Sequence, residues 1–309
     1  MTTKPTTTPD PDSAIQGGTT RNDEYHPPEV WAVPAGDSGR FSGINRPEAG
    51  ARFDAELPRG EHSLQLYSLA TPNGQKVTIM LEELLAAGVR EAEYDAHLIR
   101  IMEQSQFSSG FVAINPNSKI PALVDHSEPQ PLRVFESGAI LLYLAEKFGH
   151  FLPANRAERT ETLNWLFWLQ GSAPFVGGGF GHFYAYAPFE QEYPINRYTM
   201  ETKRLLDVLD RRLAETPYLG GAQYSIADMA TWPWFGGLVN NAVYGAATFL
   251  DARRYTHVRR WADEIGARPA VQRGIIVNSI TGDPAGQLHD RHQAADIDAA
   301  LAARRKAAG

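Results

Sequence analysis

Residues 64–85 constrain the fold most, because a strand there leads almost directly into a helix. Residues 64–69 are mostly apolar and form a run of the length of a short buried strand. Between residues 77 and 85 the apolar positions recur at the spacing of an α-helix. Thr71, Pro72, Asn73 and Gly74 lie between these two patterns, and all four are residue types that stop a strand or start a helix. The stretch therefore predicts a strand, a tight turn and a helix in succession.

The turn of this strand–helix unit is a candidate anion site. The first backbone N–H groups of a helix have no partner within the helix, and the positive end of the helix dipole lies beside them. Both features favour a negative charge in the mouth of the turn. Thr71 adds a hydroxyl and Asn73 adds an amide at the same place. A thiolate would fit such a site, and the alternative is an ordinary capped turn that binds nothing.

The rest of the chain predicts two structural domains. Residues 62–150 read as an α/β unit of thioredoxin-like order. After the first helix this unit has strands at 92–99, 121–124 and 132–135, a loop at 102–117 and a helix at 137–148. Residues 155–280 read as an all-helical domain, with helices at 156–170, 194–214, 225–240, 255–265 and 269–277. Ser225 and Asp228 have the spacing of a capping box, which is a folding device.

The two ends of the chain lack such patterns. Residues 1–25 are rich in Thr, Pro, Asp and Gly and are expected to be disordered. Residues 26–61 form an extended arm whose Trp31, Phe41 and Ile44 need an apolar surface to cover them, on the same subunit or on a partner. Residues 281–309 are expected to form a peripheral or frayed tail.

Composition excludes several classes of function. The chain of 309 residues has no cysteine, so disulfides, zinc–thiolate sites and a cysteine nucleophile are excluded. No spacing of His, Asp and Glu matches a metal site. The net charge of -7, without a basic block, disfavours nucleic acid as a partner. The N-terminus lacks the apolar region of a signal peptide, and the uncharged run 162–189 is too rich in Gly and Pro to span a membrane. We therefore expect a cytoplasmic protein with no membrane partner.

Two further motifs could bind a short peptide. Ile120 and Pro121 open a strand, and an X–Pro bond can be cis, which would turn the backbone groups of Ile120 outward to pair with an extended peptide. A trans proline at the start of a strand is the alternative. Glu136 and Ser137 follow a strand and precede a helix, so Ser137 is a predicted N-cap that could hold a carboxylate while Glu136 holds an ammonium. Together they could recognise an α-amino-acid end, and a routine cap is the alternative.

A cluster of aromatic residues between positions 165 and 189 predicts an apolar pocket. Trp165 and Trp168 fit the core of the helical domain. The part after residue 174 is broken by glycines and shows no helical period, so we interpret its rings as a pocket lining. Gln170 would lie at the pocket entrance and Arg197 just beyond it. His182 is expected to be a satisfied or solvent-facing histidine and not a catalytic base. The predicted lining residues are Phe175, Phe180, Phe183 and Tyr184.

The order of these motifs resembles that of a glutathione transferase, and the resemblance covers residues 25–292. It rests on the strings TPNGQK (71–76), NPNSKIPAL (115–123), VFESGAI (134–140) and GGGFGHF (177–183), which are closest to the bacterial Nu class. The resemblance implies that glutathione binds with its γ-glutamyl end on Glu136 and Ser137 and its cysteinyl backbone on Ile120, before a cis Pro121. Its glycyl end would then meet Gln106 and Lys119, and its thiol would meet Thr71 and Asn73.

The resemblance to the Nu class further implies two glutathiones, or one glutathione disulfide, in each site of a homodimer. Asn45, Gln170 and Arg197 would hold the second molecule. Because the protein has no thiol, glutathione itself must attack a small disulfide substrate, and the second glutathione then resolves the mixed disulfide. One alternative is conjugation of glutathione to a hydrophobic electrophile. Another is a non-enzymatic protein that binds glutathione for regulation.

Overall fold

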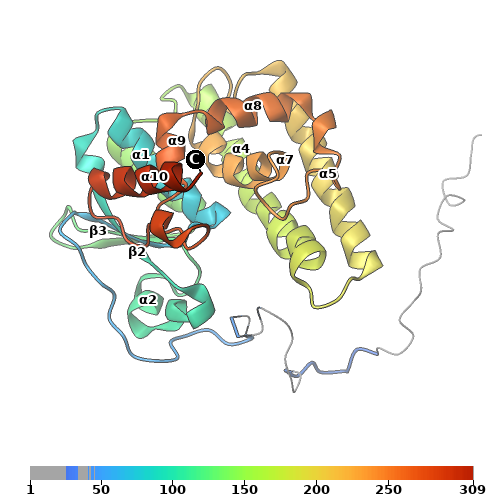
Figure 1. Cartoon of the computed structure of the whole chain (residues 1–309), viewed down its shortest axis with the longest axis horizontal. Coiled ribbons are helices and arrows are strands. Elements are labelled where there is room, and N and C mark those ends of the chain that lie inside the picture. Colours follow the sequence, from blue (N-terminus) through green and yellow to red (C-terminus); the bar gives the residue numbers. More distant parts are fainter. Residues whose placement is uncertain (1–25, 34–40, 42, 45, 309) are drawn as a thin grey trace, which may run out of the picture.

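Residues 62–150 fold into a four-stranded mixed sheet with helices, which confirms the predicted thioredoxin-like domain (Figure 1). The computed structural model describes residues 26–33, 41, 43–44 and 46–308. The strand order is β2-β1-β3-β4, with β1 parallel to β2 and antiparallel to β3. The elements of this domain are β1 (Leu64–Ser68), α1 (Pro72–Ala86), β2 (Tyr94–Leu98), α2 (Ser109–Ile114), β3 (Ala122–Asp125), β4 (Leu132–Phe135) and α3 (Ser137–Phe148).

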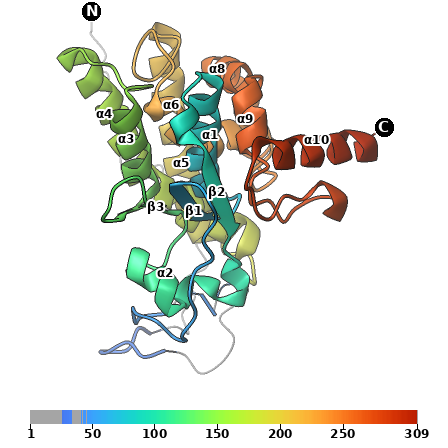
Figure 2. The same ribbon diagram turned by 90° about the vertical axis from the view of Figure 1, so that its left-hand side faces the viewer.

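Helix α1 lies between the sheet and the helical domain (Figure 2). Ten of its fifteen residues are buried, including two glutamates. Both carboxylates bind arginines from the helical domain: Arg268 binds Glu83 through two hydrogen bonds of 2.5 and 2.7 Å, and Arg273 binds Glu82 at 2.8 Å. Because both sides of α1 are packed, the helix cannot shift without breaking the contact between the domains.

The predicted loop at 102–117 is wrong in one part, because residues Ser109–Ile114 form α2. The hydroxyl of Ser108 caps this helix by accepting a hydrogen bond from the backbone N–H of Phe111 at 3.3 Å. The ring of Phe111 is fully buried in a small apolar cluster with Tyr67, Ile99, Ala122 and Val124. A six-residue helix is too short to show an apolar period, so its cap is the only sequence signal that it offers.

The second domain is helical, as predicted, and its capping box is present: the Asp228 carboxylate accepts from the Ser225 backbone N–H at 3.0 Å. The predicted helix 225–240 is observed as three consecutive helical segments. The elements are α4 (Arg156–Pro174), η5 (Phe175–Tyr186), α5 (Glu192–Glu215), α6 (Ile226–Thr231), η6 (Trp232–Gly236), α7 (Gly237–Val239), α8 (Thr256–Gly266) and α9 (Pro269–Gly274). Short 3-10 segments lie at Arg90–Ala92, Ile101–Glu103, Ser105–Phe107 and Ala252–Arg254.

The segment that we predicted to be irregular, after residue 174, is instead the π-helix η5. Its glycines are sites of close packing. A β-carbon on Gly179 would lie 2.4 Å from the ring of Tyr198, and one on Gly181 would lie 2.1 Å from the ring of Tyr244. The glycine run therefore lets neighbouring rings pack directly on the helix backbone, and it does not mark a break in the helix.

The described part of the arm has two different environments. Phe41 packs edge-on against the ring of Tyr186, with 5.2 Å between ring centroids, so this part docks on the same subunit. Trp31 is 57 % exposed. The predicted disordered segment 1–25 lies outside the described residues. None of the helices in the described part of the chain is long and apolar enough to cross a membrane.

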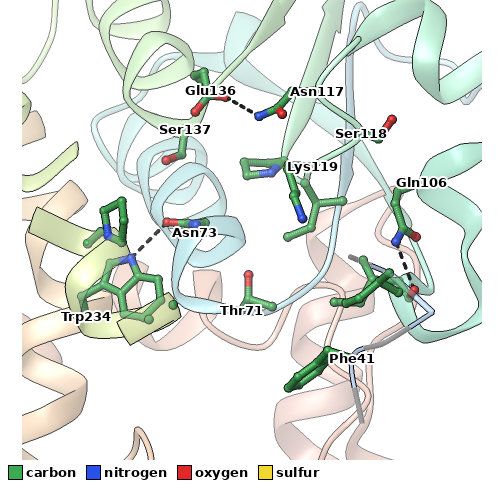
Figure 3. A pocket seen from close by; sticks show the side chains of 18 of the residues that line it. Phe41, Thr71, Asn73, Gln106, Asn117, Ser118, Lys119, Glu136, Ser137 and Trp234 are labelled. Atoms are coloured by element: carbon green, nitrogen blue, oxygen red, sulfur yellow. Dashed lines mark hydrogen bonds between the residues drawn. The ribbon is translucent and has the colours of Figure 1, made fainter. Parts of the chain in front are cut away.

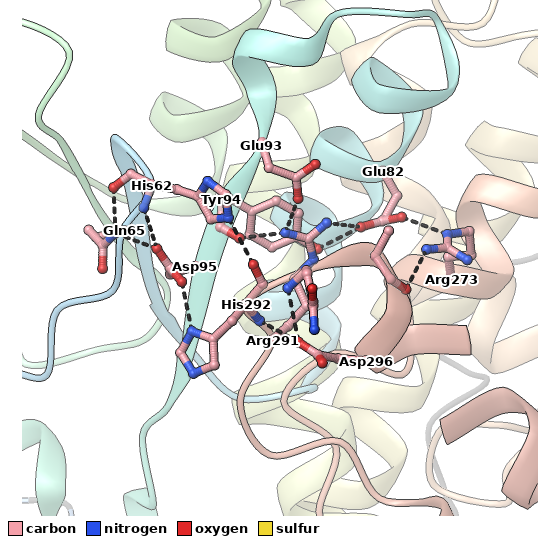
Figure 4. A network of polar contacts seen from close by, with 12 residues as sticks. His62, Gln65, Glu82, Glu93, Tyr94, Asp95, Arg273, Arg291, His292 and Asp296 are labelled. Atoms are coloured by element: carbon pink, nitrogen blue, oxygen red, sulfur yellow. Dashed lines mark hydrogen bonds and ion pairs between the residues drawn. The ribbon is translucent and has the colours of Figure 1, made fainter. Parts of the chain in front are cut away.

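The C-terminal segment is not peripheral, contrary to the prediction, because it docks on β2 (Figure 4). After η8 (Pro284–Gly286), the backbone of Arg291 pairs with that of Ala96, and helix α10 (Ala294–Ala308) follows. The Arg291 side chain is fully buried over the ring of Tyr94 and forms ion pairs with Glu82 and Glu93. A buried arginine with two carboxylate partners holds this segment on the sheet domain, and composition alone gives no sign of it.

We expect the change Arg291→Met to lower the free energy of unfolding by about 3 kcal/mol, because it removes a buried guanidinium from Glu82 and Glu93 and leaves Glu82 with Arg273 as its remaining arginine partner. Urea unfolding measures this directly. The control Arg253→Ala removes an exposed ion pair with Asp251 and should change the stability by less than about 1 kcal/mol. If the two changes had equally small effects, the C-terminal segment would not be part of the folded core.

Candidate functional site

A pocket of about 500 Å³ lies between the two domains, at the N-terminal ends of α1 and α3 (Figure 3). The arm contributes Phe41 and Ile44 to its wall, and the helical domain contributes Trp234. Most of the residues predicted from the sequence to bind a ligand line this pocket: Thr71, Asn73, Gln106, Lys119, Ile120, Pro121, Glu136, Ser137 and Gln170.

The predicted turn before α1 is formed by Thr71, which is the N-cap of the helix. Its hydroxyl oxygen accepts from the backbone N–H of Gly74 at 3.4 Å and keeps its own O–H for another partner. Gly74 is required here because a β-carbon would lie 1.9 Å from the carbonyl oxygen of Leu69. Pro72 is the first residue of the helix and is not among the residues that line the pocket.

The amide of Asn73 has its orientation set by Trp234, a contact that sequence reasoning missed (Figure 3). The indole N–H of Trp234 donates to Asn73 Oδ1 at 3.0 Å. Because an indole can only donate, the carbonyl side of the amide faces the tryptophan. The amide NH₂ of Asn73 is therefore left as a donor at the open end of α1, beside the backbone N–H of Asn73 itself, since Pro72 has no N–H and that of Gly74 donates to Thr71.

The start of α3 differs from the prediction by one residue. Glu136, not Ser137, occupies the N-cap position, with a φ of 70° and no side-chain hydrogen bond to the first turn. The Glu136 carboxylate instead accepts from Asn117 Nδ2 at 3.2 Å. The positive φ places Ser137 inside the first turn, and its hydroxyl receives a hydrogen bond from Lys76 Nζ at 3.2 Å. The first backbone donors of α3 therefore have no side-chain cap from the described residues.

Lys76 is a second residue that sequence reasoning missed. It is fully buried in α1, and burial lowers the pKa of its ammonium to about 7, although the negative charge of Glu136 raises it in part. Its position one turn before Met80, on the apolar side of the helix, is the signal that could have revealed it.

The other residues that the sequence predicted to bind a peptide also line the pocket. The Ile120–Pro121 bond is cis, which confirms the reading implied by the family resemblance. Gln106 is buried, and its amide NH₂ donates to the carbonyl of Ile101 at 3.2 Å. Its Oε1 has no partner among the described residues, so it is an acceptor suited to an N–H group rather than to a carboxylate. Lys119 is exposed at the same side of the pocket and supplies the positive charge there.

Gln170 reaches the pocket from the helical domain. It packs against Gly138 in the first turn of α3, where a β-carbon would lie 2.2 Å from Gln170 Nε2. This nitrogen has no hydrogen-bond partner among the described residues. Arg197 lies on α5, is exposed and does not line the pocket, and Asn45 lies outside the described residues. Of the two described residues assigned to a second ligand, Gln170 lines the pocket and Arg197 does not.

The aromatic residues predicted to line the pocket lie elsewhere. Phe180 is fully buried and stacks on Tyr184, Phe183 stacks on Tyr198, and Phe175 is 41 % exposed. Because η5 is helical, these rings point away from the pocket, and another side of η5 presents Gly177, Gly178, His182 and Tyr186 to it. His182 therefore lies in the pocket wall. In the described part of the chain, no cluster of three or more metal-ligating side chains is present.

Comparison with known proteins agrees with this arrangement. Residues 62–146 match the family model of the glutathione S-transferase N-terminal domain, and residues 184–264 match that of the C-terminal domain. The chain is 65 % identical to the disulfide-bond oxidoreductase YghU of Escherichia coli over 89 % of this chain and 95 % of that protein.

Two solved structures are also similar. One is the glutathione transferase YghU of Streptococcus pneumoniae in complex with glutathione, with a TM-score of 0.81 and 59 % identity over 83 % of this chain and 100 % of that chain. The other is a glutathione transferase of Pseudomonas putida with one glutathione disulfide bound per subunit. Its TM-score is 0.65, and it is 42 % identical over 71 % of this chain and 94 % of that chain.

We expect Glu136→Gly to raise the free energy of unfolding by about 1 kcal/mol. A positive φ costs about 1–3 kcal/mol in a residue with a side chain, and glycine removes this strain. The larger conformational entropy that glycine loses on folding offsets part of the gain. The control Asn117→Ala removes the same hydrogen bond to Glu136 but leaves the φ angle unchanged, so it should not stabilise. Urea unfolding of both variants tests this, and a loss of stability in Glu136→Gly would contradict it.

Proposed function

This chain belongs to the glutathione transferase family, and on that premise we propose that it reduces small disulfides with glutathione as the source of thiol. We assign it to the bacterial Nu class within the family. The observation that carries the proposal is the pair of donors at the start of α1, the side-chain amide and the backbone N–H of Asn73, in a chain that has no cysteine of its own. Such donors stabilise a thiolate that the ligand must bring.

The proposed binding mode follows the donors and acceptors of the pocket. The uncapped first turn of α3 and the Ser137 hydroxyl receive the carboxylate of the γ-glutamyl end, while Glu136 receives its ammonium. The backbone of Ile120 pairs with the cysteinyl residue. The free acceptor of Gln106 receives an N–H of the glycyl end, whose carboxylate lies toward Lys119. In this mode the thiol lies toward Thr71 and Asn73.

The chemistry is thiol–disulfide exchange in two steps. The thiolate of the first glutathione attacks one sulfur of the substrate disulfide, forms a mixed disulfide and releases one substrate thiolate, which takes up a proton. The thiolate of a second glutathione then attacks the glutathione sulfur of the mixed disulfide and releases the other substrate thiolate. Two glutathiones give up two electrons and become glutathione disulfide, and the protein is unchanged.

A second glutathione in the same pocket would make the second step effectively intramolecular. Gln170, with an unpartnered Nε2, supports such a site, as does the relative from Pseudomonas putida that binds one glutathione disulfide per subunit. We assign Arg197 and Asn45 to this second molecule in a homodimer. The exposed rings of Phe167 and Phe175 on the helical domain favour a partner surface there. We place the enzyme in the cytoplasm, where glutathione is kept reduced.

The reaction itself is tested by two substrates side by side. We expect faster turnover of 2-hydroxyethyl disulfide than of an aryl halide, because the pocket provides for two thiols. A much faster reaction with the aryl halide would favour conjugation to hydrophobic electrophiles instead. Tight binding of glutathione without turnover of either substrate would favour a regulatory binding protein.

We expect Asn73→Ala to lower kcat by about 10–100-fold, with a much smaller effect on glutathione affinity, because it removes a donor to the developing thiolate. Trp234→Phe removes only the hydrogen bond that orients the amide and should lower kcat by about fivefold, the value of one hydrogen bond. Steady-state kinetics should show that Trp234→Phe has no further effect in the Asn73→Ala background. Additive effects would mean that Trp234 does not act through Asn73.

The two-thiol site is tested by calorimetric titration with glutathione. We expect two molecules per subunit, and one for Arg197→Ala. The control Arg211→Ala changes another exposed arginine on α5, whose ion pair with Asp207 lies away from the pocket, and should leave the number at two. One molecule per subunit in the unmodified protein would contradict the proposed mechanism.

A further inference from the structure

Lys76 is a buried lysine without a carboxylate partner among the described residues. Its side chain is fully buried in α1, and its one hydrogen bond within the described residues is the 3.2 Å contact with Ser137 Oγ. No carboxylate of the described residues lies within 4.0 Å of its ammonium. An ammonium has three donors, so two of them have no partner there. Burial of an unpaired charge is costly, and the steps proposed above make no use of this residue.

The other charged side chains that pack against α1 have partners of opposite charge. Arg291 has carboxylates of Glu82 and Glu93 beside it, and Arg268 binds Glu83 through two hydrogen bonds. These pairs hold the C-terminal segment and α9 against α1. Lys76 points instead toward the start of α3, where the first-turn N–H groups have no side-chain cap. Two positive features with unused donors therefore meet at Ser137.

We propose that Lys76 is a positioning residue for the carboxylate of an α-amino-acid end. Its ammonium donates to the Ser137 oxygen and so directs the Ser137 O–H toward the carboxylate. The carboxylate in turn supplies the negative charge that Lys76 lacks. This inference rests on the proposed function, since glutathione is the ligand that brings that carboxylate. A serine hydroxyl that accepts from an ammonium has its O–H free to donate to the ligand. The interaction takes place in a buried setting, where a charge pair is weakly screened.

The proposed role predicts that a proton is taken up when the ligand binds. Burial lowers the pKa of Lys76 to about 7, and the charge of Glu136 offsets part of that effect. A bound carboxylate favours the charged ammonium, so it raises the pKa of Lys76. The ligand therefore binds with uptake of a proton at pH values above about 7, and its affinity falls as the pH rises.

The charged groups on the elements packed around α1 have other partners. The Asp228 carboxylate on α6 is held by Ser225, Trp261 and the backbone N–H of Leu219. Arg268 and Arg273 at α9 bind the two glutamates of α1. The segment η6 carries no titratable side chain. On α3, Lys147 binds Asp125 and Glu146 binds Arg159, and Arg90 and Glu91 on the 3-10 segment Arg90–Ala92 are exposed to solvent. Glu136 before α3 is the remaining charge that acts on Lys76.

The test uses S-methylglutathione, which has no ionisable thiol, and the full-length protein. Between about pH 6.5 and about pH 8.5 we expect its affinity to fall about tenfold, as linkage requires for a pKa raised on binding. Calorimetry in two buffers of different ionisation enthalpy should show proton uptake at the higher pH. Unchanged affinity together with zero uptake would overturn the inference.

A matched ligand separates Lys76 from other groups without a mutation. The analogue with 4-aminobutyryl in place of the γ-glutamyl residue lacks only the α-carboxylate. Its binding should be weaker and should take up no proton. His182, which also lines the pocket, would give the same uptake with both ligands. Equal uptake with both ligands therefore contradicts a role for the carboxylate and Lys76.

The variants complete the design. Lys76→Met should bind S-methylglutathione about tenfold more weakly at about pH 6.5 and show neither pH dependence nor proton uptake. Lys76→Arg, which stays charged, should bind without pH dependence. A Lys76→Met protein that keeps the uptake of the unmodified protein overturns the inference. Absence of any binding to the unmodified protein would contradict the proposed function and this inference together, whereas binding without a pH effect contradicts only the latter.

Discussion

Burial of α1 between the sheet and the helical domain is the constraint on which the rest of the structure depends. A helix that is covered on both sides must satisfy its polar residues internally, and the arginines of α9 and of the C-terminal segment do so for Glu82 and Glu83. The same contacts fix the axis of α1 and so the direction of its first N–H groups. Its open end faces a pocket in which α3 also begins. Two helix N-termini are thereby held toward one ligand: α1 offers the amide and the backbone N–H of Asn73, and α3 offers its uncapped first-turn N–H groups.

The absence of cysteine limits the thiol chemistry that this pocket can support. The protein offers donors but no thiol, so any thiol chemistry has to use a thiol from the ligand. The amide of Asn73 reaches the pocket from the α/β domain, but its orientation comes from Trp234 in the helical domain. The site is therefore complete only when the two domains are packed together. The same holds at the other end of the pocket, where Gln170 packs on the first turn of α3.

Much of this could be predicted from the sequence, because the strand–turn–helix unit, the Ser225 capping box and the long α5 depend on local patterns. What could not be predicted depends on distant partners. The buried state of Arg291 requires Tyr94 and Glu82, about two hundred residues earlier in the chain. The glycines of η5 look like breaks, but they are contacts for rings on other helices. The cap of α3 shifts to Glu136 because that residue adopts a positive φ, which no propensity for glutamate indicates.

The central claim is that the start of α1 binds the thiol of glutathione as a thiolate. Ultraviolet absorbance of the thiolate, followed against pH for glutathione bound to the protein, tests it most directly. The account predicts a bound thiol with a pKa well below the value of about 8.5 of a free cysteine thiol, and a pKa closer to that value in Asn73→Ala. A bound thiol that titrates at the same pH as free glutathione would contradict the claim.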